Sequence, residues 1–202
     1  CIQFSPDYRS VSRVVDGVKV TSWFLPKHRD TGERVLQQGS DALRFFNKRF
    51  GPYPYTELDL VEAPLTGGAG GVEFPGLVTL ASMFYGSSGG SGLPESVEAL
   101  MVENPMMRDT LEFVVAHEVA HQWWNAVVGS DSKQHPFVDE ALANHSAILY
   151  FEALHGKKAK ETQIELQLRV PYQIARLAGA QDRPVDLPTE GYASMLEYAA
   201  IV

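Results

Sequence analysis

The sequence contains a single cysteine, Cys1, in 202 residues. One cysteine cannot form an internal disulfide framework or a zinc site built from several thiolates. Stable folding therefore has to rest on a buried apolar core, and the 45% hydrophobic content is normal for a globular protein. A chain of this length fits one large domain or two small lobes.

Long apolar runs and an excess of basic charge are missing as well. No stretch reaches about 18 consecutive apolar residues, so we expect no segment of this chain to insert directly into a membrane. The 17 basic and 25 acidic residues give a formal net charge of −8, which disfavours a nucleic-acid partner. The chain begins at Cys1 without an initiator methionine and stops at Val202 without a polar tail, so we expect a domain excised from a longer chain. Both a cytoplasmic and an extracytoplasmic or membrane-associated parent protein fit this composition.

The first half of the chain is predicted to contain most of the strands. Residues 11–25 are rich in β-branched side chains and are interrupted by Asp16 and Gly17, a dipeptide favoured in tight hairpins. The further elements expected here are a helix over 33–49, strands over 56–63 and 77–82, and an exposed Gly/Ser-rich loop over 86–95.

The second half is predicted to be helical. Asp109 and Glu112 have the spacing of a capping box, and the apolar run after them continues to Gly129, a predicted C-cap. Two more helices are expected, one with Asp139 as its N-cap and its end near Gly156, and one that is broken or kinked at Pro171. Strands followed by helices predict an α+β fold, with a small mixed-sheet lobe over about 1–100 and a helical lobe over about 101–202.

The segment HEVAHQWW, residues 117–124, carries the strongest chemical signal. On a helix, His117 and His121 lie one turn apart on the same face, so both imidazoles can reach one cation. Glu118 lies about 100° further round and is placed to accept a proton from water on that cation. Zinc lowers the pKa of bound water from about 15.7 to roughly 7, which produces a nucleophile at neutral pH. Since these polar groups are costly inside an apolar helix unless they are partnered, we prefer a metal site to a hydrogen-bonded pair of core histidines.

A catalytic zinc site needs a third protein ligand and one open position. Downstream of the helix, the candidates are His135, Asp139 and Glu140. We prefer Glu140, because the 18 residues between it and His121 allow the chain to turn back along the zinc helix. Asp139 is better used as a helix N-cap, and His135 stays an alternative by residue type alone.

HEVAHQWW followed after 18 residues by Glu140 in FVDEALA resembles the gluzincin aminopeptidases of the zinc aminopeptidase N (membrane alanyl aminopeptidase) family. GGVEFPGLV at 70–78 stands where that family carries its GxMEN exopeptidase motif, and FGPYPYTELDLVE at 50–62 is similar to the segment before it. The resemblance runs from about Val20 to the C-terminus. It implies that residues 1–202 form a thermolysin-like zincin catalytic domain with one Zn²⁺ per chain.

The resemblance also implies a mechanism. His117, His121 and Glu140 would hold the zinc, and Glu118 would activate the water that attacks the first peptide bond. The implied substrates are peptides with a free N-terminus, whose ammonium group Glu73 would bind. The remaining implied substrate-binding residues are Gly70, Gly71 and Val72, where backbone approaches the peptide.

This chain departs from the family pattern at two positions of that motif. Val72 stands for the usual methionine and Phe74 for the usual asparagine, so a polar side chain next to Glu73 is absent. The family's oxyanion-stabilising tyrosine follows another tyrosine in a Y-x4-Y arrangement, which places Tyr198 on the first and the second just past Val202. By resemblance, flanking domains of the parent chain would complete the site. We therefore expect the isolated chain to bind zinc with little or no peptidase activity.

Two other functions remain open from the sequence. A thermolysin-like endopeptidase would share the zinc helix but have no use for Glu73, and a non-catalytic scaffold would retain only the fold. The other histidines, expected at the surface or at helix ends, are His28, His135, His145 and His155.

Overall fold

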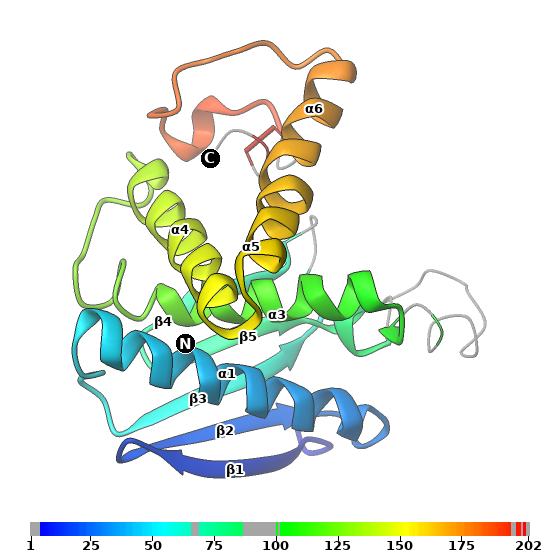
Figure 1. The fold of residues 1–202 in the computed structure, drawn as a ribbon, viewed down its shortest axis with the longest axis vertical. Helices are drawn as coiled ribbons and strands as arrows, with labels where there is room; N and C mark the ends of the chain where they lie inside the picture. The colour runs from blue at the N-terminus through cyan, green and yellow to red at the C-terminus, as the bar shows by residue number, and fades with distance from the viewer. Residues whose placement is uncertain are drawn as a thin grey trace.

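The computed structural model describes residues 5–65, 69–86, 100, 102–194, 197, 198 and 200, and it places the sheet at one end of the molecule and the later helices at the other (Figure 1). Apart from Gly86, the Gly/Ser-rich loop predicted over 86–95 lies outside the described residues. None of the described helices is long and apolar enough to span a bilayer.

The chain opens with the predicted hairpin. Strands β1 (Arg9–Val15) and β2 (Val18–Phe24) pair in antiparallel register from Arg9 with Phe24 to Val15 with Val18. Asp16 and Gly17 form the turn with φ of 51° and 85°. Positive φ at both central residues is what the tightest two-residue hairpin turns require, which explains the Asp-Gly dipeptide.

The remaining strands extend this hairpin into a mixed sheet, as expected. β3 (Glu57–Ala63) and β5 (Leu77–Ala81) confirm the two predicted strands, and β4 (Gly71–Phe74) joins them. The order is β1-β2-β3-β5-β4, in which β2, β3 and β5 are parallel, while β4 runs antiparallel to β5. In the part of the chain that the structure describes, β4 is therefore an edge strand.

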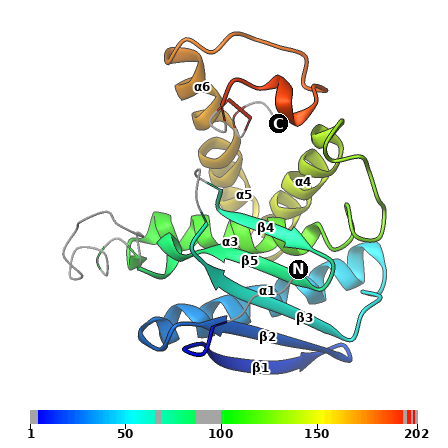
Figure 2. The ribbon, with the colours of Figure 1, turned by 180° about the vertical axis from the view of Figure 1, so that it is seen from behind.

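Helix α1 (Arg29–Phe50) confirms the helix predicted over 33–49 and begins four residues earlier. Its apolar positions recur at helical spacing, so one stripe faces the sheet. Leu43 and Phe46 on this stripe have no exposed surface. Seen from behind, the strands lie in front of α1, so the helix covers one face of the sheet only (Figure 2).

Helix α3 (Pro105–Ala120) packs beside α1 on the same face and carries the HEVAH segment at its C-terminal end. The predicted start at Asp109 is wrong. Asn104 is the N-cap, its side chain accepting a hydrogen bond of 2.9 Å from the Met106 N–H, and Pro105 occupies the first turn, where its missing donor costs nothing. The predicted C-cap at Gly129 is also wrong, because the helix ends at Ala120 and tight turns follow.

Helix α4 (Pro136–His155) packs against α3 and ends before Gly156, as predicted. Its start differs from the prediction, because Asp139 lies in the first turn and is not the N-cap. Proline at the first helical position fixes the entry instead. This shift of the N-cap by four residues, from Asp139 to His135, leaves Glu140 in the second turn of a helix that faces α3.

The last helical stretch is continuous, but its backbone hydrogen-bond pattern changes along its length. α5 (Lys157–Gln163) passes through a π-helical segment (Ile164–Arg169) into α6 (Val170–Leu177). The kink predicted at Pro171 takes this form, because a proline lacks an N–H and clashes with the carbonyl four residues earlier, and a wider turn relieves both.

The architecture confirms an α+β layout. In both views, α4 and the rod of α5 and α6 rise as two arms from the sheet, α1 and α3, and the C-terminal segment lies between the ends of the arms (Figures 1 and 2). The core fills the space between the sheet and the helices, and its fully buried members include Val20, Val35, Leu58, Leu60, Val78, Leu80, Val115 and Val119.

Candidate metal centre

The two histidines of HEVAH converge on one point. His117 lies in the last turn of α3 and His121 directly after it. Their Nε2 atoms are 3.1 Å apart. The side chain of His121 is only 1% exposed and that of His117 14%, so His121 is buried and His117 keeps limited contact with solvent.

Glu140 completes the cluster from α4. Its Oε2 atom lies 3.1 Å from Nε2 of His117 and 3.7 Å from Nε2 of His121. Zinc bonds of about 2.0–2.1 Å in tetrahedral geometry separate neighbouring ligand atoms by about 3.3 Å. The three donor atoms therefore already have the spacing and the chemistry of a zinc site.

Hydrogen bonds at Nδ1 fix the ring orientations of both histidines. Nδ1 of His117 lies 3.1 Å from Oδ1 of Asn144, and Nδ1 of His121 lies 3.0 Å from the carbonyl oxygen of Trp124. Because both partners are acceptors, Nδ1 carries a proton in each ring, and Nε2 is the nitrogen that faces the cluster and would bind a metal once it is deprotonated. The sequence prediction missed both partners, although the spacing of four residues between Glu140 and Asn144 places them on one face of α4.

The carboxylate and the imidazoles of the cluster each shift the pKa of the other toward its charged form. Burial raises the pKa of Glu140, but the hydrogen bonds from His117 and His121 outweigh burial and hold this pKa well below its usual range. Burial likewise lowers the pKa of His121, but the carboxylates around it, with Glu140 first, raise it to about 9. The Tyr198 hydroxyl donates to Oε1 of Glu140 at 3.3 Å, which leaves Oε2 to face the histidines.

Glu118 lies beside the cluster without joining it. The residue is 6% exposed, and its Oε2 atom has no hydrogen-bond partner among the described residues. Burial raises its pKa to about 7, with His117 and His121 opposing and Glu73 and Glu140 adding to this effect. A carboxyl group with a pKa near neutrality suits proton transfer in both directions.

Strand β4 brings the predicted substrate-binding residues to the same place. One ligand-type atom each from Glu73, Glu118 and His121 lie within 4.8 Å of one another. The Gly71 Cα lies so close to α3 that a Cβ there would be 2.5 Å from the Glu118 carboxyl carbon. Gly70 is less constrained, since its Cβ would lie 3.2 Å from a methyl carbon of Val114, a tight contact that a small shift would relieve.

Gln122, in the turn directly after α3, connects this helix to β4. Its Oε1 accepts from the Gly76 N–H at 2.8 Å, and its Nε2 donates to the Phe74 carbonyl at 3.0 Å. The side chain has no exposed surface. On β5, the Thr79 hydroxyl donates to the Val72 carbonyl at 3.1 Å. β4 is thus fixed from two sides by hydrogen bonds to its backbone.

The two alternative third ligands lie apart from the cluster. His135 is exposed, and its Nδ1 lies 2.8 Å from Oδ1 of Asp186. Asp139 is 2% exposed and burial raises its pKa, but its carboxylate is not part of a metal-type cluster among the described residues. Of the other histidines, His28 lies at a helix junction as expected but is buried, with Nδ1 2.8 Å from Oε1 of Glu62.

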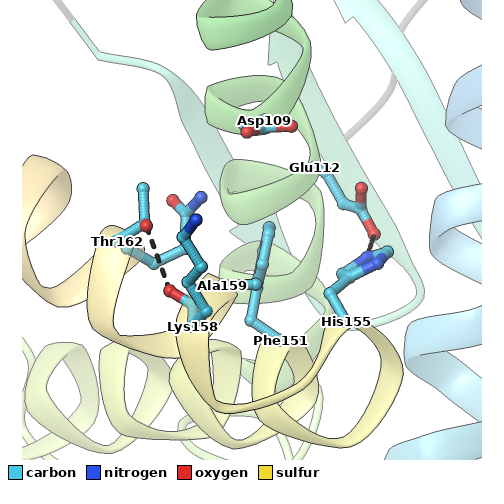
Figure 3. A pocket seen from close by; sticks show the side chains of 8 residues that line it. Asp109, Glu112, Phe151, His155, Lys158, Ala159 and Thr162 are labelled. Carbon is cyan, nitrogen blue, oxygen red and sulfur yellow. Dashed lines mark hydrogen bonds and ion pairs between the residues drawn. The ribbon is translucent and has the colours of Figure 1, made fainter.

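A separate pocket of about 380 Å³ opens between α3, α4 and α5 (Figure 3). Asp109 and Glu112 from α3 face His155 at the end of α4, and Lys158 and Thr162 from α5. Glu112 accepts hydrogen bonds from His155 at 2.7 Å and from Tyr150, outside the pocket lining, at 2.8 Å. The pocket contains none of the residues predicted for the site.

Comparison with known proteins gives a consistent result. Residues 34–198 match the model of the Peptidase family M1 domain. The chain is 29% identical over 140 residues to Aminopeptidase M1 of Arabidopsis thaliana, covering 69% of this chain and 15% of that protein. It is 28% identical over 141 residues to Aminopeptidase N of Acetobacter pasteurianus, covering 68% and 36%. Over 195 residues it is 24% identical to Endoplasmic reticulum aminopeptidase 1 of Mus musculus, covering 95% and 19%. The chain thus spans about a third or less of the length of these relatives.

Proposed function

The chain belongs to peptidase family M1, and we propose that it forms the zinc-binding catalytic domain of an aminopeptidase. The observation that carries this proposal is the position of Glu73, whose carboxylate lies beside His121 and Glu118 on an edge strand. An enzyme that cuts at internal bonds has no need of a further carboxylate there. A carboxylate close to the reacting bond is what a free N-terminal ammonium requires.

The metal would be held by His117, His121 and Glu140. When bound, zinc polarises the scissile carbonyl and lowers the pKa of water to roughly 7. Glu118 accepts the proton from the attacking water and returns it to the amine that leaves. A buried carboxyl group with a pKa of about 7 is suited to both transfers, because neither its acid nor its base form is strongly disfavoured at neutral pH.

The substrate would bind along β4. The outer edge of this strand can pair with an extended peptide through backbone hydrogen bonds, and Gly70, Gly71 and Val72 supply that backbone. Glu73 then receives the ammonium group. Because a Glu73 oxygen lies within 4.8 Å of a ring nitrogen of His121, a longer N-terminal segment would not fit between Glu73 and the residues that would hold the metal, and cleavage would be limited to the first residue.

We further propose a thermolysin-like arrangement for this domain, with a sheet-containing lobe over about 1–100 and a helical zinc-binding lobe over about 101–202. The site then lies between the lobes, because β4 belongs to the first, α4 to the second, and α3 contacts both. The relatives are much longer than this chain, and on this proposal other domains of the parent protein complete the substrate cavity.

The test uses the full-length protein and a pair of peptides that differ only in N-terminal acetylation. We expect cleavage of the first residue from the free peptide, none from the acetylated one, loss of activity with a chelator and recovery with zinc. Glu73→Gln should weaken cleavage of the free peptide, while Glu165→Gln, a change at an exposed carboxylate of the π-helical segment, should not. Equal cleavage of both peptides at internal bonds would establish an endopeptidase, and failure to bind zinc would establish a non-catalytic scaffold.

A further inference from the structure

We propose that Asn125 is a positioning residue of this site, which orients the Glu73 carboxylate to receive a protonated primary amine. This inference rests on the proposed function and specifies how the site selects the amine. The Asn125 side chain donates from Nδ2 to Oε1 of Glu73 at 2.9 Å. Within the described part of the chain, no other group donates a hydrogen bond to that carboxylate.

The hydrogen bond joins two separate elements. Glu73 lies on β4, and Asn125 lies 52 residues later in the turns that follow α3. The residue after Glu73 is Phe74, which carries no polar group, so β4 itself offers no side-chain support there. With one oxygen held by Asn125, the second is left to face an incoming ligand.

The backbone at Asn125 is unusual and points to the same role. Its φ is 120°, and among the described residues only one other non-glycine residue, Asp16, has a positive φ. The hairpin turn accounts for Asp16, whereas Asn125 lies in the turn between Trp124 and Val128, which form an isolated β-bridge. A strained backbone at a site persists only where surrounding contacts hold it. Here, the Asn125 N–H donates to the Val128 carbonyl at 3.0 Å.

The same turn orients a predicted metal ligand. The carbonyl of Trp124, in the peptide unit directly before the Asn125 side chain, accepts from Nδ1 of His121 at 3.0 Å. One short piece of backbone therefore fixes the ring of His121 and, through the next side chain, the carboxylate of Glu73. This shared turn therefore fixes the position of the Glu73 carboxylate relative to the His121 ring.

The chemistry of an amide suits this position. Lysine or arginine would also orient a carboxylate, but a full positive charge there would neutralise Glu73 and compete with the substrate's ammonium group. Aspartate has the same shape but would repel Glu73. An asparagine donor fixes the geometry and leaves the negative charge of Glu73 for the ligand.

The experiment measures the binding of an amino-acid amide by calorimetry and the cleavage of a free-amine peptide, both with full-length zinc-loaded protein. The variants are Asn125→Gly, which removes the amide and relieves the backbone, Asn125→Ala, which removes the amide alone, and Asn125→Asp. Ala126→Gly in the same turn is the matched control, because it loosens the backbone but keeps the amide.

We expect Asn125→Gly and Asn125→Ala to raise both the Kd of the amide and the KM of the peptide about tenfold, with a smaller change in kcat and an unchanged zinc content. Asn125→Asp should raise them further, and Ala126→Gly should leave them near the wild-type values. Wild-type affinity in Asn125→Gly and Asn125→Ala would overturn this inference alone. Equal binding of the amide by the wild type and Glu73→Gln would overturn the proposed role of Glu73, and this inference with it.

Discussion

Gly71 and Glu118 are in such close contact that a single methyl group between them has no room, since a Cβ on Gly71 would lie 2.5 Å from three atoms of the Glu118 side chain. The strand proposed to bind substrate therefore packs directly on the proposed general base. Any side chain at position 71 would therefore displace either β4 or the Glu118 side chain.

Gly71→Ala is accordingly expected to displace the Glu118 carboxylate without touching the metal ligands. A displacement of about 1 Å at a reacting group lowers kcat on the order of 10²-fold. Zinc content measured by atomic absorption should stay at the wild-type level. Gly129→Ala is the control, because a Cβ at that glycine would make an ordinary contact of 3.6 Å. Equal activity of the two variants would contradict the close contact.

Glu118→Gln tests proton transfer itself. Glutamine keeps the shape of the side chain but cannot accept the proton, so we expect kcat to fall about 10²- to 10⁴-fold. Zinc should remain bound, because Glu118 does not belong to the cluster of His117, His121 and Glu140. Kinetics on a free-amine peptide, with zinc content measured on the same sample, distinguish the two effects. Near-normal turnover would remove Glu118 from its proposed role.

Gln122→Leu should remove the hydrogen bonds that connect the end of α3 to β4 and the turn after it. The change leaves the Gly76 N–H and the Phe74 carbonyl without the partners they have now at 2.8 and 3.0 Å. An unpaired buried group costs about 1–3 kcal/mol, so the free energy of unfolding in urea should fall by at least this amount. Gln181→Leu, at an exposed position, is the comparison and should change stability little. A variant as stable as the wild type would show that the connection carries no energy.

The stability of the protein should depend on pH differently with and without zinc. In the metal-free cluster, the pKa of His121 is raised from 6.5 to about 9, because the surrounding carboxylates outweigh burial. A raised pKa stabilises the folded state fully below pH 6.5, and this contribution is lost as the pH rises through about 9. We expect the chelated protein to lose on the order of 1–3 kcal/mol over this window.

The zinc-loaded protein should not show this loss, because metal binding requires a neutral imidazole at any pH in the window. Thermal unfolding at several pH values, with chelator and with zinc, makes the comparison within one protein. A parallel pH dependence of both forms would contradict the assigned charge on His121. Addition of zinc to the chelated protein at neutral pH should also release protons, which calorimetry in two buffers detects.

Local chemistry predicted much of the fold. Asp16 and Gly17 specified the hairpin, and Gly156 marked the end of α4, because each acts through the backbone within a few residues. Helix starts were less accurate. Asn104 followed by proline is a stronger start than Asp109 with Glu112, and the prediction relied on the capping-box spacing instead.

The cluster proposed to bind the metal was predictable to the extent that it depends on helix geometry. His117 and His121 share a face of α3 by their spacing, but Glu140 reaches them through packing of α4 on α3. The role proposed for Glu73 followed from family resemblance. No local pattern could predict the contact with Asn125, because it depends on how a turn meets a strand 52 residues away.

Among the described strands, β4 has one edge that pairs with no other strand, and this edge has a further consequence. A strand edge that can pair with a peptide can equally pair with the same strand of another copy, which is how sheet proteins begin to aggregate. Brevity and a charged side chain are two defences against this, and β4 has both, with four residues and Glu73 among them. The carboxylate proposed to bind the substrate thus also opposes self-association. Replacing Glu73 with valine would leave an apolar strand edge that favours aggregation.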